Sequence, residues 1–308
     1  MSARTRNTAA AIALAAAVTG TALLGGSGFA NAAQAATAAK SSSHGTLTIS
    51  NGTKYVLING HWVNFGVPVR DLAWSPNGAK AAFIDGAGNL DVANADGSRR
   101  VVVAKNPGGQ NWSHPTWQVA KADTQDGIPA KNNLIFAARA NGVSRLKYVA
   151  ATAVHGTPRT LPLVAEPGPG VPSLPQTGNV WPNAAGGHGT SVYANSSTGE
   201  VYIRDDYIRQ QGGALTKGSQ PALSPNEEEV VFVRSVAGHD HVLVEDFTTG
   251  HVKDLTPHAT TDYTEPAWSA DGTTLAVRTP SGTVTMPASG SGHPTKVTSV
   301  VGLAAYRP

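Results

Sequence analysis

Residues 71–78 read Asp-Leu-Ala-Trp-Ser-Pro-Asn-Gly, and the chain returns to this pattern at residues 265–272 as Glu-Pro-Ala-Trp-Ser-Ala-Asp-Gly. Weaker copies stand at residues 220–226 (Gln-Pro-Ala-Leu-Ser-Pro-Asn) and 114–118 (His-Pro-Thr-Trp-Gln). A short apolar run followed by Pro, Asn or Asp, and Gly is typical of a β-strand that ends in a turn. Each copy therefore predicts the end of one strand and the turn into the next.

One aromatic or leucine side chain marks each repeat, in the order Trp74, Trp117, Trp181, Leu223, Trp268 and Tyr306. The steps between these markers are 43, 64, 42, 45 and 38 residues. A period near 42 residues is typical of a β-propeller, in which each repeat forms one four-stranded antiparallel blade. The long step contains two surplus segments, residues 120–132 and 166–178, which we interpret as exposed insertions.

The two ends of the repeat region each provide part of a blade. Residues 304–308 (Ala-Ala-Tyr-Arg-Pro) match an inner strand alone, whereas residues 47–65 contain three strands, joined by Asn-Gly turns, without an inner strand. We predict that they combine into one composite blade, which protects the edges of the first and last strands. Together with five internal blades, this gives an all-β, six-bladed propeller over residues 45–308.

The repeats of the form Pro-Ala-Trp-Ser-Pro-Asn/Asp-Gly followed by a strand resemble those of the TolB-like six-bladed β-propeller family. The resemblance covers about residues 45–308 and is close in the repeats of Trp74, Leu223 and Trp268. It implies a propeller fold and the binding of a protein or a ligand through the channel mouth or the loops.

The N-terminus has the layout of a secretory signal peptide. Arg4 and Arg6 precede an uncharged run over residues 9–24, and two tripeptides with small end residues follow, Ala-Asn-Ala and Ala-Gln-Ala. We predict a cleaved signal peptide over residues 1–35, a flexible lead-in over residues 36–44, and a secreted mature protein. The run is shorter than the ~20 residues that a membrane-spanning helix needs, so we expect no membrane span after cleavage.

Charge and cysteine content exclude several classes. Removal of residues 1–35 takes away two of the 23 basic residues and none of the 20 acidic ones, leaving a net charge of +1. This balance gives no electrostatic footprint for nucleic acid. The chain has no cysteine, which excludes disulfides, a thiol nucleophile and a cysteine-based metal site. We expect a monomer whose partner is an unidentified protein or small ligand.

The position three residues before each marker is the candidate binding site. It holds Asp71, His114, Gly178, Gln220, Glu265 and Leu303. If the inner strands line the axis, these side chains surround one mouth of the channel. We take Asp71, His114, Gln220 and Glu265 as the ligand-binding candidates, with solvated rim residues as the structural alternative. We expect no resident cofactor, although carboxylates and a histidine facing one another also suit a channel-mouth cation.

Catalytic motifs are absent: the sequence contains neither G-x-S-x-G nor H-E-x-x-H, and its ten histidines show no metal-site spacing. We therefore expect a non-catalytic binding or scaffold protein. One alternative is a metal-dependent hydrolase or lactonase that uses Asp71, Gln220 and Glu265 at the channel mouth. Another is a cell-wall or matrix protein cross-linked through Lys and through glutamines in predicted loops: Gln110, Gln125, Gln176, Gln210 and Gln211. The sequence also predicts that residues 239–241 (His-Asp-His) form a hairpin tip.

Overall fold

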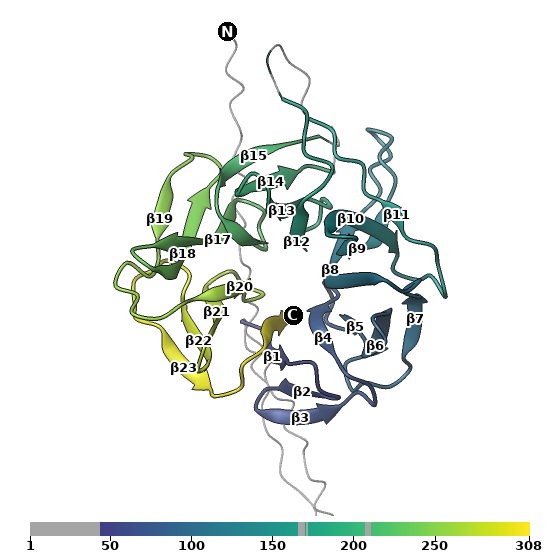
Figure 1. The fold of residues 1–308 in the computed structure, drawn as a ribbon, viewed down its shortest axis with the longest axis horizontal. Helices are drawn as coiled ribbons and strands as arrows, with labels where there is room; N and C mark the ends of the chain where they lie inside the picture. The colour runs from purple at the N-terminus through teal and green to yellow at the C-terminus, as the bar shows by residue number, and fades with distance from the viewer. Residues whose placement is uncertain (1–43, 166–169, 171, 207–210) are drawn as a thin grey trace, which may run out of the picture. The chain divides into compact units, whose positions relative to one another are not determined.

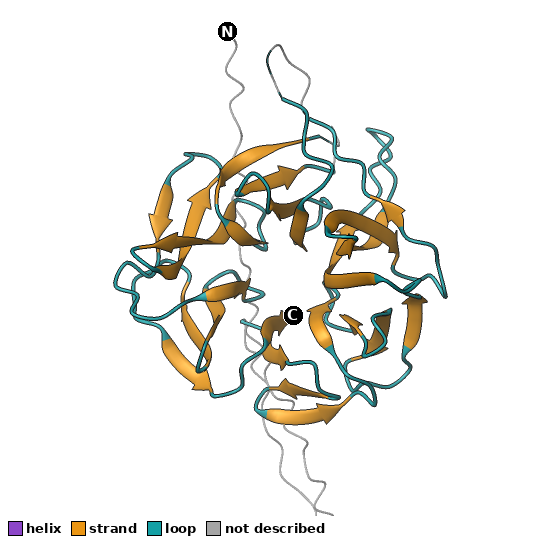
Figure 2. Ribbon diagram, in the orientation of Figure 1, coloured by secondary structure: helices purple, strands orange, loops and turns teal. Residues whose placement is uncertain are grey.

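A computed structural model describes residues 44–165, 170, 172–206 and 211–308, all within the compact unit Ser41–Pro308. The predicted signal peptide and the lead-in up to residue 43 lie outside the described residues. The described part is built of β-strands and connecting turns without helices (Figure 2). Consequently it offers no helix long and apolar enough to cross a membrane.

Six four-stranded antiparallel sheets form a ring around a central channel, as predicted (Figure 1). We number the internal blades 1 to 5 in chain order. Blade 1 comprises β4 (Arg70–Trp74), β5 (Lys80–Ile84), β6 (Leu90–Asn94) and β7 (Val101–Ala104). Blade 2 comprises β8 (Gln110–Ala120), β9 (Lys131–Ala140), β10 (Val143–Ala150) and β11 (Arg159–Thr160). Blade 3 comprises β12 (Asn179–Ala184), β13 (Ser191–Asn195), β14 (Glu200–Arg204) and β15 (Gly212–Lys217).

The remaining sheets follow the same plan, with the first strand of each internal blade nearest the channel. Blade 4 comprises β16 (Ser219–Leu223), β17 (Glu229–Val236), β18 (His239–Asp246) and β19 (Val252–Asp254). Blade 5 comprises β20 (Thr264–Trp268), β21 (Thr274–Thr279), β22 (Gly282–Pro287) and β23 (Thr295–Thr298). The composite blade comprises β24 (Leu303–Arg307), β1 (Thr46–Ser50), β2 (Tyr55–Ile58) and β3 (His61–Asn64).

The composite blade closes the ring, which confirms the prediction made from the chain ends. β24 pairs with β1 along its whole length, from Thr46 opposite Arg307 to Ser50 opposite Leu303. The Nε of Arg307 donates to the carbonyl of Gly78 in blade 1 at 2.7 Å. On the other side, the backbone N–H of Ala270 in blade 5 donates to the carbonyl of His44 at 3.1 Å. The closing blade is therefore hydrogen-bonded to both of its neighbours.

The motif that defines the repeat builds turns. The Ser75 hydroxyl donates to Asn77 Oδ1 at 2.8 Å, and the Gly78 N–H donates to the Ser75 carbonyl at 2.8 Å. In blade 5, the Ser269 hydroxyl donates to Asp271 Oδ1 at 2.7 Å in the same way. An Asn or Asp two residues after a Ser thus satisfies the polar groups of each turn locally.

Three of the marker tryptophans, Trp74, Trp117 and Trp268, are buried. The indole N–H of Trp117 donates to the Ala73 carbonyl at 3.1 Å, and that of Trp268 donates to the Ala222 carbonyl at 2.9 Å. Each bond joins a blade to the one before it in the chain. Burying a large indole ring with its one donor satisfied stabilises the blade interface, so these residues are structural, as expected.

The first surplus segment extends the β8–β9 hairpin. Residues 121–130 connect the two strands, Asp123 and Ile128 pair across them, and Ala120 forms an isolated bridge with His188 of blade 3. Part of the second surplus segment, residues 166–169 and 171, lies outside the described residues.

Two expectations about loops are wrong. Residues 239–241 begin β18, and the turn before them is formed by Ala237 and Gly238. A left-handed φ of 50° at Ala237 moves the tip two residues upstream of the predicted place. Gln110 begins β8 and is not in a loop, because blade 2 has a longer inner strand than the repeat predicts.

Candidate functional site: the central channel

The inner strands of all five internal blades share one irregularity. Their pairing with the next strand shifts register at Asp71, His114, Trp181, Gln220 and Glu265. These residues have φ values of 55°, 51°, 49°, 51° and 50°, the left-handed region that non-glycine residues seldom adopt. A bulge of this kind re-aims a side chain and stores strain at functional or junction positions. The five side chains therefore occupy equivalent places around the axis.

The equivalent residue in blade 3 is Trp181, and the expectation of Gly178 there is wrong. Gly178 precedes β12, and Ala184 takes the place that the marker tryptophan has in blade 1. The bulge residue is followed by proline in four blades: His114-Pro115, Trp181-Pro182, Gln220-Pro221 and Glu265-Pro266. This X-Pro pair is the signal that aligns blade 3 correctly; the conspicuous tryptophan pointed to the wrong register.

Two of the four candidate residues join neighbouring blades. The His114 N–H donates to Asp71 Oδ2 at 3.1 Å, and the Glu265 N–H donates to Gln220 Oε1 at 2.7 Å. In each pair, the side chain of one bulge residue accepts from the backbone of the next blade's bulge residue. Asp71 and Gln220 therefore contribute to blade alignment, and Gln220 also lines the central cavity.

The other two candidates meet across the channel. Blades 2 and 5 face each other in the ring (Figure 1), and His114 Nε2 lies 3.5 Å from Glu265 Oε1. Glu265 also receives Arg278 Nη1 at 2.7 Å, and the His114 ring packs edge-on to Trp181 with centroids 6.2 Å apart. The pair bridges the channel at this level. We call it the His114–Glu265 bridge.

The geometry does not bring three metal ligands to one point. His114 Nδ1 lies 4.0 Å from Asp71 Oδ2, while its Nε2 faces Glu265, so the two carboxylates approach different edges of the ring. A tetrahedral or octahedral site needs donors converging at about 2.0–2.6 Å from one ion. In the described part of the chain, no group of three or more His, Asp or Glu has such an arrangement.

A cavity of about 410 Å³ lies along the axis, with His114, Gln220 and Glu265 at one end. Its wall is formed largely by small and ring side chains of the inner strands, such as Ala73, Ala267 and Trp181. At its other end it reaches Pro76 and Pro308, which are exposed, so this mouth opens to solvent. The volume lies in the range of small-molecule sites, ~300–1,000 Å³.

Glu227 fixes one part of the open mouth. Its Oε1 accepts from the N–H groups of Gly187 at 2.7 Å and His188 at 3.1 Å, and its Oε2 accepts from the Thr190 hydroxyl at 2.8 Å. The neighbouring Gly186 lines the cavity. The Glu227 carboxylate of blade 4 thus holds the loop at residues 187–190 of blade 3 at the rim. No sequence pattern predicted this contact.

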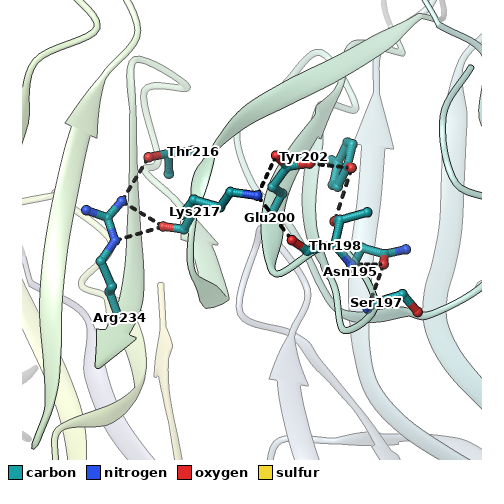
Figure 3. Close-up of polar contacts among 8 residues, drawn as sticks. All are labelled: Asn195, Ser197, Thr198, Glu200, Tyr202, Thr216, Lys217 and Arg234. Atoms are coloured by element: carbon teal, nitrogen blue, oxygen red, sulfur yellow. Dashed lines mark hydrogen bonds and ion pairs between the residues drawn. The ribbon is translucent and has the colours of Figure 1, made fainter. Parts of the chain in front are cut away.

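Away from the channel, a row of polar contacts links β14 and β15 of blade 3 to β17 of blade 4 (Figure 3). Arg234 Nη2 donates to the Lys217 carbonyl at 2.7 Å and to the Thr216 hydroxyl at 3.0 Å. Lys217 Nζ in turn lies 2.9 Å from Glu200 Oε1, and the hydrogen bonds from Lys217 and Tyr202 lower the pKa of Glu200. These groups satisfy one another, so the row is structural.

A buried carboxylate lies between blades 2 and 3. Asp206 accepts from Arg204 at both oxygens, at 2.9 Å from Nε and 2.7 Å from Nη2, and its Oδ1 lies 2.8 Å from Lys131 Nζ. Gln118 donates to its Oδ2. Burial alone would raise the pKa of Asp206, but the hydrogen bonds and charges of Arg204 and Lys131 outweigh it, and the pKa is lowered.

A second buried carboxylate lies in blade 1. Asp91 is opposite Phe83, whose ring packs against Phe65 beside the composite blade. Its Oδ2 accepts from Arg100 Nη1 at 2.6 Å, while its buried Oδ1 has no partner among the described residues. Burial and the nearby Asp85 raise the pKa of Asp91 to about 6, against the lowering effect of Arg100.

Comparisons with known proteins agree on the fold. The chain is similar to the crystal structure of TolB from Acinetobacter baumannii, with a TM-score of 0.62 and 17% identity over 86% of this chain and 67% of that one. It is also similar to a putative TolB from Agrobacterium tumefaciens, with a TM-score of 0.57 and 16% identity over 83% of this chain and 89% of that one. No protein-family model and no curated protein sequence matches it. The TolB-like six-bladed propeller fold follows, and at these identities the likeness concerns the fold alone.

Proposed function

We propose that the chain is an exported, non-catalytic binding protein whose central cavity receives a ligand or a segment of a partner through the mouth at Pro76 and Pro308. The observation that carries the proposal is the cavity itself, about 410 Å³ in volume, with the His114–Glu265 bridge at one end and solvent at the other. A concave, mostly apolar site with a few polar groups at fixed places is the usual form of a binding pocket.

The pairing of the channel residues supports a role without catalysis. Glu265 is engaged by Arg278 at 2.7 Å, and Asp71 accepts the His114 N–H at 3.1 Å. A general acid or base needs a group free to exchange a proton with a substrate, whereas Asp71 holds a backbone N–H of the next blade and Glu265 is ion-paired with Arg278.

The cross-linking alternative has a narrower basis than the sequence suggested. Gln110 accepts from the Trp112 indole at 2.8 Å, and Gln176 donates to the carbonyls of Leu163 and Leu174. Gln125 is exposed in the β8–β9 connection, whereas Gln210 lies outside the described residues.

The test is a cavity-filling variant. Ala267 is half-buried in the cavity wall, so Ala267→Phe should block the cavity while leaving the blades intact. Wild-type protein, Ala267→Phe and the exposed control Ala214→Phe would be incubated with extract and culture medium of the source cells and examined by native mass spectrometry. We expect a bound component on the wild type and the control but not on Ala267→Phe.

Two outcomes would overturn the proposal. Equal retention by Ala267→Phe would place the binding elsewhere, and no retention by the wild type would remove its basis. Metal analysis of the same samples addresses the hydrolase alternative: a stoichiometric ion lost in Asp71→Ala and Glu265→Ala would favour that alternative.

A further inference from the structure

His114 lines the cavity with both ring nitrogens buried and without a hydrogen-bond partner in the described part of the chain. Besides it, four side chains around the cavity carry a hydrogen-bond donor that no described group accepts. They are Trp181 and Asn183 on β12, Gln220 on β16 and Tyr306 on β24. None of their polar atoms is among the buried atoms without a partner, so these donors are accessible. A set of accessible donors in a mostly apolar cavity indicates what kind of ligand fits it.

The orientation of the two amides follows from their backbone contacts. Asn183 Oδ1 accepts from the Leu223 N–H at 2.9 Å, and Gln220 Oε1 accepts from the Glu265 N–H at 2.7 Å. A backbone N–H can meet only the oxygen of an amide, so in both residues the NH2 group is the end left without a partner. Asn183 and Gln220 therefore offer the cavity donors and not acceptors.

Trp181 and Tyr306 add donors of the same kind. An indole N–H can only donate. Burial, followed by the charge of Asp271, raises the pKa of Tyr306 to about 12, so the phenol keeps its proton at neutral pH. Trp181, Asn183 and Gln220 lie on the adjacent inner strands of blades 3 and 4, which groups three donors on one side of the cavity.

The cavity offers little to an ion. Among the described residues that line it, the acidic and basic side chains are His114 and Glu265, and these face each other at 3.5 Å. Glu265 is also neutralised by Arg278 at 2.7 Å. A charged ligand would lose its hydration in an apolar site without gaining a counter-charge, which is costly.

We propose that the cavity binds an uncharged, mostly apolar small molecule that carries at least one hydrogen-bond acceptor, such as a ketone, ester or ether oxygen. This inference rests on the proposed function and assigns its ligand class. The apolar wall holds the carbon skeleton, and the donors of Trp181, Asn183 and Gln220 select molecules with oxygen atoms on one side. A molecule without acceptors leaves these donors unsatisfied and binds more weakly.

The experiment uses three naphthalene probes with the purified protein. Prodan is uncharged and carries a ketone, 2-(dimethylamino)naphthalene lacks the ketone, and 8-anilinonaphthalene-1-sulfonate is an anion. Their fluorescence reports transfer into an apolar site. We expect one prodan per chain, bound at least about tenfold more tightly than the ketone-free analogue, as one or two hydrogen bonds would give.

The matched variant is the double substitution Asn183→Asp with Gln220→Glu. It keeps the oxygens that accept from Leu223 and Glu265 and replaces the two NH2 groups with acceptors. We expect it to weaken the binding of prodan by about tenfold or more and to leave the affinity for the ketone-free analogue unchanged. Gln125→Glu is the control for an added negative charge at an exposed site, and circular dichroism confirms that each variant is folded.

The outcomes separate this inference from the proposed function. If Ala267→Phe abolishes binding of both uncharged probes but the double variant changes neither, the ligand class is overturned and the cavity remains a binding site. Tightest binding of the anion also overturns the class. Binding of prodan that survives Ala267→Phe contradicts both. If no probe binds, the class is overturned, and the native mass spectrometry of the wild type decides the proposed function.

Discussion

Asp206 and Asp91 are both buried carboxylates at blade interfaces, and their pKa values move in opposite directions. Asp206 has donors at both oxygens, from Arg204, Lys131 and Gln118, and its pKa is lowered. Asp91 has Arg100 at one oxygen, nothing in the described chain at the other, and a pKa raised to about 6.

The difference shows that burial by itself does not decide the charge of an acid. The charged form survives removal from water only when hydrogen bonds and opposite charges replace the lost hydration. Around Asp206, donors replace the lost hydration at both carboxylate oxygens. Around Asp91 they replace it at one oxygen only, and the nearby Asp85 adds charge repulsion. The interface of blades 2 and 3 therefore depends on an ion cluster. In blade 1, by contrast, the charged form of Asp91 destabilises the folded state at neutral pH.

Asp206→Ala should have the largest effect. It leaves Arg204 and Lys131, whose side chains are 6% and 13% exposed, without their shared counter-charge. Removing one partner of a buried ion pair costs about 3–5 kcal/mol, measured by urea unfolding at pH 7. The exposed Asp126→Ala is the control, with an expected change under about 0.5 kcal/mol. A loss below about 1 kcal/mol for Asp206→Ala would mean that the cluster contributes little.

Asp91→Asn should remove a pH-dependent loss of stability. With a pKa of 3.8 in the unfolded chain and about 6 in the folded one, the native state holds a proton that the unfolded state releases. Stability from this group therefore falls as the pH rises from about 4 to about 6, by about 2–3 kcal/mol. Asn cannot titrate, so unfolding free energies of variant and wild type, compared from pH 4 to pH 7, should shift in favour of the variant. A constant difference would contradict the raised pKa.

Arg100→Gln tests the half of the Asp91 site that is satisfied. The variant removes the donor at 2.6 Å and raises the pKa of Asp91 further. We expect a loss of about 1–2 kcal/mol at pH 8, where Asp91 is charged, and a smaller loss at pH 4, where it is protonated. Chemical denaturation at both pH values checks this. An equal loss at both would assign the effect of Arg100 to packing alone.

Lys131→Met should have the smallest effect of the four. Asp206 keeps both bonds from Arg204, so the loss at pH 7 should be about 1 kcal/mol. The pKa of Asp206 in the folded protein lies below 3.8. The stabilisation that the charged Asp206 provides is therefore lost as the pH falls from 3.8 through this lower, folded pKa. The cost of the substitution should therefore shrink below pH 3.8, and acid unfolding curves would show a constant cost if Lys131 acted only by packing.

The sequence predicted what local chemistry determines. Asn-Gly and Ser-Pro-Asn-Gly turns, with strands between them, were enough for the six blades, and the missing inner strand at the N-terminus predicted the composite blade. The register of blade 3 was missed because Trp181 has the chemistry of a marker but occupies the bulge. The proline that follows it, Pro182, indicates the correct register, because a proline follows the bulge residue in three other blades as well.

The sequence predicted where the four candidate residues lie but not which groups they contact. Asp71, His114, Gln220 and Glu265 do lie at one level of the channel, since equivalent repeat positions meet around an axis. The partners that decide their chemistry, such as Arg278 on the second strand of blade 5, come from outside the repeat motif. Besides Arg204, two residues away, Asp206 is contacted by Gln118 and Lys131, which lie 88 and 75 positions away in the sequence, so no local pattern predicts these two contacts.

The pairing of β1 with β24 sets an order of events during synthesis. These strands stand 257 residues apart at the Thr48–Ala305 hydrogen bond, so the first strand waits for its partner until the last blade has been made. Loop closure over such a length is slow compared with hairpin formation. The growing chain therefore carries an unpaired β1 edge, a template for aggregation, until the ring closes. Protection of that one edge by a chaperone is what we expect folding in the cell to require.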